Sequence, residues 1–179
     1  DIKPIFDQVV NDPIFDYETH KNAWIFQNSD LTPQHVMDAP SINEVKPAIQ
    51  KIFNNYLVTA HNKPFDLRFL RSRNFIINDI KCLMKSCKEH KIVLNHTGKP
   101  KAPSVEEAYK ALFPNETYVE KHRGGDDSLH EAKILLKLCD IKAGKFTPIP
   151  LILSEEYAIA KRQKKLMKEK NILKQYRKF

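Results

Sequence analysis

Apolar side chains recur at helical spacing in several stretches of the chain. The Ser-Ile-Asn-Glu sequence at 41–44 has the residues of a capping box, and an apolar stripe continues from it to Phe53. Residues 104–113 repeat this arrangement, with Ser104 as the cap. From 126 to 139, apolar residues at the i, i+3, i+4 and i+7 positions predict a third buried helix face. Three amphipathic helices are therefore expected in these regions.

Other apolar runs have the short length typical of strands. Residues 6–10 alternate between apolar and polar positions, whereas 57–60 and 75–77 are more continuously apolar. Helices are predicted from Asp66 onward and over 80–87, so strands and helices alternate along the chain. This alternation predicts an α/β fold, in which helices cover a sheet.

The remaining parts of the chain are basic and less regular. Residues 90–103 contain lysines, Gly98 and two prolines without periodicity, which predicts either a solvated loop or a flank that contacts phosphate groups. Prolines after residue 145 interrupt the chain and predict a main domain over 1–145 and a basic helical extension over 146–179. The extension suits a solvated helix, a nucleic-acid contact or a contact with a partner protein.

Composition restricts the partners of this protein more than its fold. Its 179 residues contain 30 Lys and Arg against 22 Asp and Glu, and the formal net charge of +8 favours a polyanionic partner such as nucleic acid or serves solubility. The three cysteines have neither disulfide-framework nor metal-site spacing, so a reducing, cytoplasmic setting is expected. No apolar run approaches the ~18 residues of a membrane span, so we expect no membrane partner.

Candidate chemistry lies just before the third predicted helix. His122 is followed five residues later by Asp127, with Gly124 and Gly125 between them. Glycines leave the entry to the helix bare, so a substrate backbone could approach between the imidazole and the carboxylate. The plainer interpretation is a loop histidine and an aspartate that caps the helix.

A second stretch changes the balance between these interpretations. The run at 57–60 leads into His-Asn-Lys-Pro-Phe-Asp at 61–66, where a polar turn opens a helix. Together with His-Arg-Gly-Gly-Asp-Asp at 122–127, in this order and about 60 residues apart, it resembles the second and third motifs of DnaQ-like 3′–5′ exonucleases. The resemblance is to the DEDDh branch, which includes the proofreading epsilon subunit of bacterial replicative polymerase, and it covers roughly residues 5 to 140.

This resemblance implies a fold, an activity and a set of site residues. The fold would be RNase H-like, with a mixed central sheet flanked by helices and a basic C-terminal helix added. The activity would be 3′–5′ hydrolysis of nucleic acid, with single-stranded DNA expected as substrate, in DNA replication or repair. Asp66 and Asp127 would hold two Mg²⁺ or Mn²⁺ ions, and His122 would be the general base. The residues expected at the substrate are His61, Asn62 and Phe65.

The first motif of the family has two candidate positions. Asp16 and Glu18, within Asp-Tyr-Glu-Thr, match it by their letters and would then be metal ligands. However, an Asn-Asp-Pro lead-in is unusual for a central strand, and 50 residues before Asp66 are too few for the intervening elements of the family. On a competing alignment, residues 6–13 resemble the third strand and the true first motif lies upstream of Asp1. Both alignments stay open at this point.

If the first motif is absent, as in the second alignment, a different function is expected. Without its first motif, the chain would be a degenerate exonuclease domain that serves as a nucleic-acid-binding or polymerase-associated assembly module. Its basic extension at 146–179 would then dock it on nucleic acid or on a polymerase or other replication protein.

Overall fold

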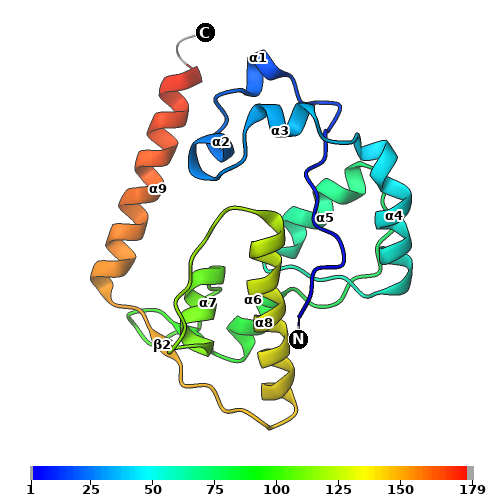
Figure 1. The fold of residues 1–179 in the computed structure, drawn as a ribbon. Coiled ribbons are helices and arrows are strands. Elements are labelled where there is room, and N and C mark those ends of the chain that lie inside the picture. The colour runs from blue at the N-terminus through cyan, green and yellow to red at the C-terminus, as the bar shows by residue number, and fades with distance from the viewer. Residues whose placement is uncertain (1, 177–179) are drawn as a thin grey trace.

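The computed structural model describes residues 2–176 and is rich in helices (Figure 1). The elements in chain order are α1 (Tyr17–His20), α2 (Trp24–Asn28), α3 (Pro33–Met37), α4 (Ile42–Asn55), α5 (Lys63–Ser72), α6 (Leu83–Glu89), β1 (Val93–Leu94), α7 (Val105–Leu112), α8 (Gly124–Lys142), β2 (Leu151–Ile152) and α9 (Glu155–Tyr176).

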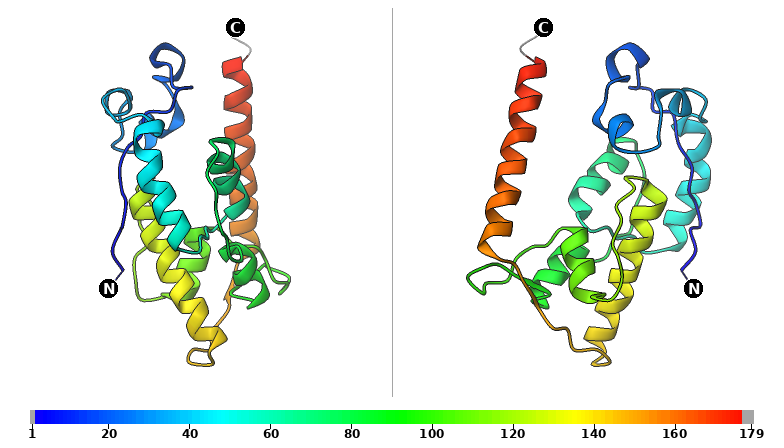
Figure 2. Two further views of the ribbon diagram at one scale, coloured as in Figure 1. Left: turned by 90° about the vertical axis from the view of Figure 1, so that its right-hand side faces the viewer. Right: turned by 60° about the vertical axis from the view of Figure 1, so that its left-hand side comes forward.

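The main hydrophobic core lies where α6, α7 and β1 pack against α8. Ile134 of α8 and Ile92 before β1 are fully buried there, and Tyr109 of α7 is almost so. Leu153, which follows β2, belongs to the same core. Burial of these apolar side chains is the main force that fixes α8 in the middle of the molecule, with α4 and the N-terminal segment on its other side (Figure 2).

The mixed central sheet expected from the resemblance is not confirmed. In the described residues the sheet has two parallel strands, with Val93 beside Leu151 and Leu94 beside Ile152. Residues 6–10 and 75–77 are not strands, and the 57–60 run pairs only at Val58. A strand requires a neighbour along its length, and Val58 has only the backbone of Asn78 and Ile80 as partners.

The predicted helices are present, with some changes at their ends. The Ser41 and Ser104 capping boxes both form, at the starts of α4 and α7. The helix predicted from residue 126 begins earlier, at Gly124, so that Asp126 and Asp127 lie inside its first turn. The helix expected over 80–87 begins at Leu83. The short helices α1 to α3 were not predicted, because each spans only about one turn.

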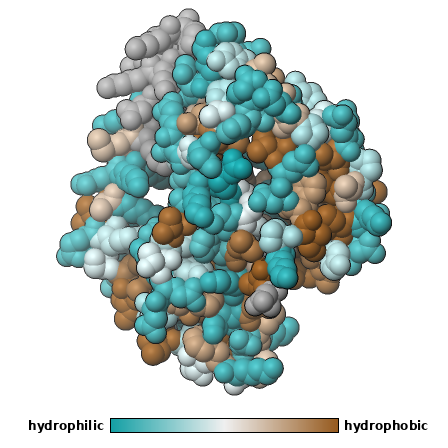
Figure 3. Space-filling model, in the orientation of Figure 1, coloured by the Kyte–Doolittle hydropathy of each residue, from teal (hydrophilic) through white to brown (hydrophobic). Residues whose placement is uncertain are grey.

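A hydrophobic groove lies between the N-terminal segment, α4, the 56–59 stretch and α8. It encloses about 510 Å³, and its apolar lining includes Ile5, Phe53 and Leu135. Hydrophobic surface gathers on the α4 side of the molecule (Figure 3). Glu131 also lines this groove, so the groove reaches the acidic cluster described next. No helix in residues 2–176 has both the length and the apolar character needed to cross a bilayer.

Candidate active site

Asp66 lies in the first turn of α5. The helix starts at Lys63 and carries Pro64 near its beginning, where a missing N–H costs no helical hydrogen bond. The segment before α5 is fixed by backbone hydrogen bonds between Val58 and residues Asn78 and Ile80. The turn at 61–62 therefore lies between this anchored segment and the start of α5. Burial raises the pKa of the Asp66 carboxyl above its ordinary value, although the residue keeps access to solvent.

Asp127 lies in the first turn of α8, two residues after Gly125. A Cβ on Gly125 would overlap the carboxylate of Asp7, so the Asp7 side chain would have to shift if residue 125 were not a glycine. The Oδ1 atom of Asp127 is buried and has no hydrogen-bond partner among the described residues. Burial, followed by the charges of Glu120 and Asp126, raises the pKa of the Asp127 carboxyl.

Glu131 joins these two aspartates and was missed by the sequence analysis. It lies one helical turn after Asp127, and its Oε2 accepts a hydrogen bond of 3.0 Å from the backbone N–H of His61. The pKa of Glu131 is raised to about 7, chiefly by burial; the hydrogen bond from His61 lowers it, and the nearby charges of Asp66 and Asp127 raise it. The Glu131 carboxyl group is therefore close enough to Asp66 and to Asp127 for the charge of each to act on its pKa. The i, i+4 spacing from Asp127 was the signal in the sequence that could have found Glu131.

His122 lies beside this region on the loop that enters α8. Its backbone adopts the left-handed conformation, with φ of 55°. Its ring packs edge-on against Trp24 of α2 at 4.7 Å between centroids, and its Nδ1 lies 3.4 Å from the Glu120 carboxylate. Its charge, when present, acts favourably on Asp127. Trp24 and Glu120 match no motif, so their position beside His122 could not be predicted from the sequence.

His61 is buried and its backbone N–H bonds to Glu131 of the candidate site. Its Nε2 lies 2.8 Å from the carbonyl oxygen of Pro103, and its own carbonyl accepts hydrogen bonds from the backbone N–H of Met84 and the thiol of Cys82. Only 4% of the residue is exposed, and burial lowers the pKa of its ring. His61 therefore ties the start of α5 to α6, α7 and, through its N–H, to Glu131.

The neighbours of His61 face outward. Asn62 is exposed, and its side chain makes no capping bond to α5. Phe65 on the same turn is 65% exposed, an unusual fraction for a phenylalanine. Both residues are therefore accessible to a ligand beside Asp66.

Asp16 and Glu18 are used locally. Asp16 caps α1 by accepting a 2.8 Å hydrogen bond from the N–H of Thr19, and Glu18 pairs with Lys21. Both acidic residues are exposed, and in residues 2–176 no hydrogen bond or ion pair connects them to the three carboxyl groups of the candidate site. They lie on a short helix and its cap, not on a central strand.

The donor set has the chemistry of a divalent-cation site. Carboxylate oxygens are the ligands that Mg²⁺ and Mn²⁺ prefer, and the unpartnered Asp127 Oδ1 and the raised pKa values of Asp66, Asp127 and Glu131 indicate negative charge that lacks a counterion. Within residues 2–176, however, no three His, Cys, Asp or Glu side chains are close enough to hold one ion. The donor atoms of Asp66, Asp127 and Glu131 thus have the chemistry that suits such an ion, but the described side chains are not arranged as a formed metal site.

Comparison with known proteins adds one finding. Residues 5–135 match the model of the RNase T family, described as exonuclease. The matched region includes α4 to the middle of α8, and so Asp66, His122 and Asp127. No curated protein and no solved structure matches the chain significantly.

Proposed function

Because the chain belongs to the exonuclease family, we propose that it is a metal-dependent 3′–5′ exonuclease that removes nucleotides from the 3′ end of single-stranded DNA. The observation that carries this proposal is the electrostatic coupling of Glu131, two turns into α8, with Asp66 and Asp127 in the first turns of α5 and α8. Each of the three has a raised pKa, and one of their oxygens is buried without a partner. Such charge is costly unless a cation balances it.

Each residue has a role that follows from its surroundings. Asp66 and Asp127, assisted by Glu131, would hold Mg²⁺ or Mn²⁺; such an ion, when bound, would supply a hydroxide nucleophile at neutral pH and would stabilise charge on the attacking and leaving oxygens. His122 accepts the proton of the attacking water. Its Nδ1 faces Glu120, which leaves Nε2 as the nitrogen for proton transfer, and the ring of Trp24 limits its rotation.

The surface beside the carboxyl groups suits the end of a strand. Gly124 has no atom within 4 Å of its open side, so a backbone can approach the start of α8 closely. The exposed ring of Phe65 offers a face on which a terminal base can stack, a contact that contributes about 1–3 kcal/mol per base. Asn62 next to it supplies a donor and an acceptor.

The experiment measures shortening of 5′-labelled single-stranded DNA with Mg²⁺, with Mn²⁺ and with EDTA. We expect a ladder of products shortened from the 3′ end with either metal, none with EDTA, and a loss of at least about 10²-fold in Asp66→Asn and Asp127→Asn. Asp140→Asn, in the last turns of α8, is the matched control and should keep the rate. Absence of metal-dependent shortening in the unaltered protein, or equal rates in Asp127→Asn and Asp140→Asn, contradicts the proposal.

A further inference from the structure

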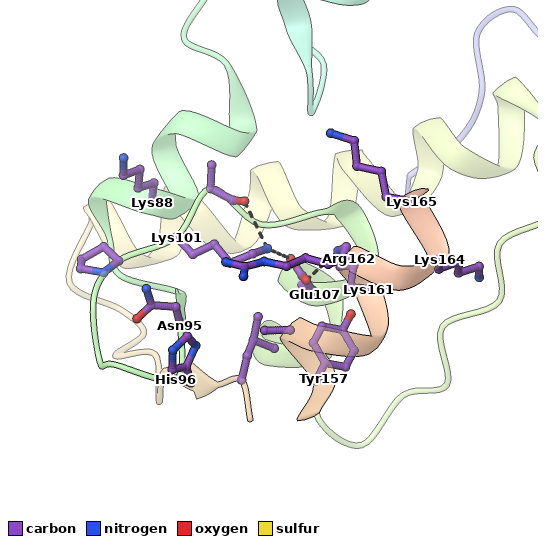
Figure 4. Close-up of a pocket in the computed structure, with 14 residues that line it drawn as sticks. Lys88, Asn95, His96, Lys101, Glu107, Tyr157, Lys161, Arg162, Lys164 and Lys165 are labelled. Carbon is purple, nitrogen blue, oxygen red and sulfur yellow. Dashed lines mark hydrogen bonds and ion pairs between the residues drawn. The ribbon is translucent and has the colours of Figure 1, made fainter. Parts of the chain in front are cut away.

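A second cavity lies away from the three carboxyl groups, between the 95–102 loop and the first turns of α9 (Figure 4). It encloses about 750 Å³ and is lined by parts of the chain that are far apart in sequence, from Lys88 in α6 to Lys165 in α9. The helix α9 rises beside the body of the molecule, with its first turns next to this loop (Figure 2). The cavity is called the basic cleft below.

The lining of the basic cleft is strongly cationic. Its charged residues include six Lys and Arg, which are Lys88, Lys101, Lys161, Arg162, Lys164 and Lys165. Glu107 is the one carboxylate in the lining, and it is buried, with 2% of the residue exposed. Lys101 and Lys161 both bond to Glu107, the latter at 2.7 Å. Its charge is therefore already balanced from within the protein.

Glu107 also fixes the shape of the basic cleft. It closes the capping box of α7 with Ser104, and its two lysine contacts tie the loop and α9 to the start of that helix. Burial alone would raise the pKa of Glu107, but the hydrogen bonds from Lys101, Lys161 and the Ser104 N–H lower it to about 2. The carboxylate is therefore ionised at neutral pH and holds both ammonium groups in place.

Other cations of the cleft lack an internal counterion. Among the side chains that the structure describes, those of Lys88, Arg162 and Lys164 have no ion-pair or hydrogen-bond partner. Figure 4 shows Arg162 reaching from α9 toward Lys101, so two cations meet where the only carboxylate is already paired. Charges of one sign gathered in a cleft create a field that concentrates anions there.

We propose that the basic cleft binds the phosphodiester backbone of a nucleic-acid strand at a place distinct from the hydrolytic site. Arg and Lys are the side chains that bind phosphate oxygens, and those of α9 follow the helix over more than one turn, which suits a run of phosphates better than one small anion. Tyr157 and the exposed His96 line the same cleft and offer ring faces to the bases of a bound strand.

The test measures binding of a fluorescent single-stranded oligonucleotide by anisotropy in EDTA, so that hydrolysis plays no part. The cleft variant carries Arg162→Ala, Lys164→Ala and Lys165→Ala, all at exposed positions of α9 where alanine favours the helix. The matched control removes the same charge outside the cleft through Lys51→Ala, Lys85→Ala and Lys142→Ala, also at exposed helix positions.

At about 0.1 M salt we expect the cleft variant to lose about tenfold to a hundredfold in affinity for the oligonucleotide. The slope of the logarithm of its association constant against the logarithm of the salt concentration should become less steep by about 2. The control should change less than about threefold. Full affinity in the cleft variant, or equal losses in both variants, overturns the proposal. So does binding of the unaltered protein to phosphatidylserine vesicles with none to the oligonucleotide. The failure of hydrolysis alone leaves these measurements unchanged, since they contain no metal.

Discussion

Glu131→Gln tests whether the ionised Glu131 carboxylate is unfavourable in the folded protein, as its burial and its acidic neighbours indicate. The substitution removes the charge of a partly buried side chain and keeps an oxygen that can accept the hydrogen bond from the His61 N–H. Packing and volume change little, so the effect on stability reports the charge itself.

The magnitude and its sign follow from the pKa of Glu131. Its value rises from 4.5 to about 7, chiefly through burial. At about 1.4 kcal/mol for each pH unit between these values, the ionised side chain costs the folded state up to about 3 kcal/mol. Between pH 4.5 and 7 the folded protein binds more protons than the unfolded one, so the contribution of this group falls as pH rises. The penalty is absent below pH 4.5 and complete above pH 7.

The assay is urea unfolding in EDTA at pH 4.5 and pH 8. At pH 8 we expect Glu131→Gln to be more stable than the unaltered protein by about 1–3 kcal/mol, and at pH 4.5 the two should agree within about 0.5 kcal/mol. The control is Glu155→Gln, at an exposed position in the first turn of α9, which should change stability by less than about 1 kcal/mol at both pH values. If Glu131→Gln is no more stable at pH 8, or differs equally at both values, the inferred cost of ionising Glu131 is wrong.

Three further substitutions test other parts of the site. His122→Asn keeps a residue that tolerates the left-handed backbone, so an unaltered fold with turnover lowered on the order of 10²-fold or more is expected, and unchanged turnover would remove His122 from the mechanism. Gly125→Ala should be less stable than Gly124→Ala by about 1 kcal/mol in thermal unfolding, because its Cβ meets Asp7, and adding Asp7→Ala should erase the difference. Glu107→Gln should cost about 1–3 kcal/mol at pH 7, and the cost should vanish as pH falls from 4.5 toward about 2, because the group with the lowered pKa stabilises only when ionised; a difference that persists at the lower pH contradicts this account.

Local features of the fold could be predicted from the sequence. The capping boxes at Ser41 and Ser104 depend on residues three positions apart, and both form as predicted. The sheet could not be predicted in the same way, because strands depend on distant partners. Val93 and Leu94 fall in a segment predicted to be a loop, and they form a strand because Leu151 and Ile152 lie beside them.

In the candidate site, too, features set by nearby residues could be predicted from the sequence, whereas features set by distant residues could not. Asp66, His122 and Asp127 are found by their motifs, and each motif lies at a recognisable helix start. Glu131 has no motif of its own, because its role comes from burial and from His61 and Asp66, which lie more than sixty positions earlier in the chain. The basic cleft likewise joins the 95–102 loop to α9, two segments whose basic character was visible but whose contact was not.

The letters Asp-Tyr-Glu-Thr at 16–19 show why a motif needs its structural setting. An aspartate three residues before a threonine also fits a helix start, since the Asp16 carboxylate accepts from the N–H of Thr19. Glu18 lies in the first turn of the same helix, where it pairs with Lys21, one turn further on. Local helix chemistry therefore explains both acidic residues without a metal. We therefore propose Asp66, Asp127 and Glu131 as the ligands for the proposed hydrolysis in place of Asp16 and Glu18, because burial and distant charges, and not local helix chemistry, set the pKa values of these three.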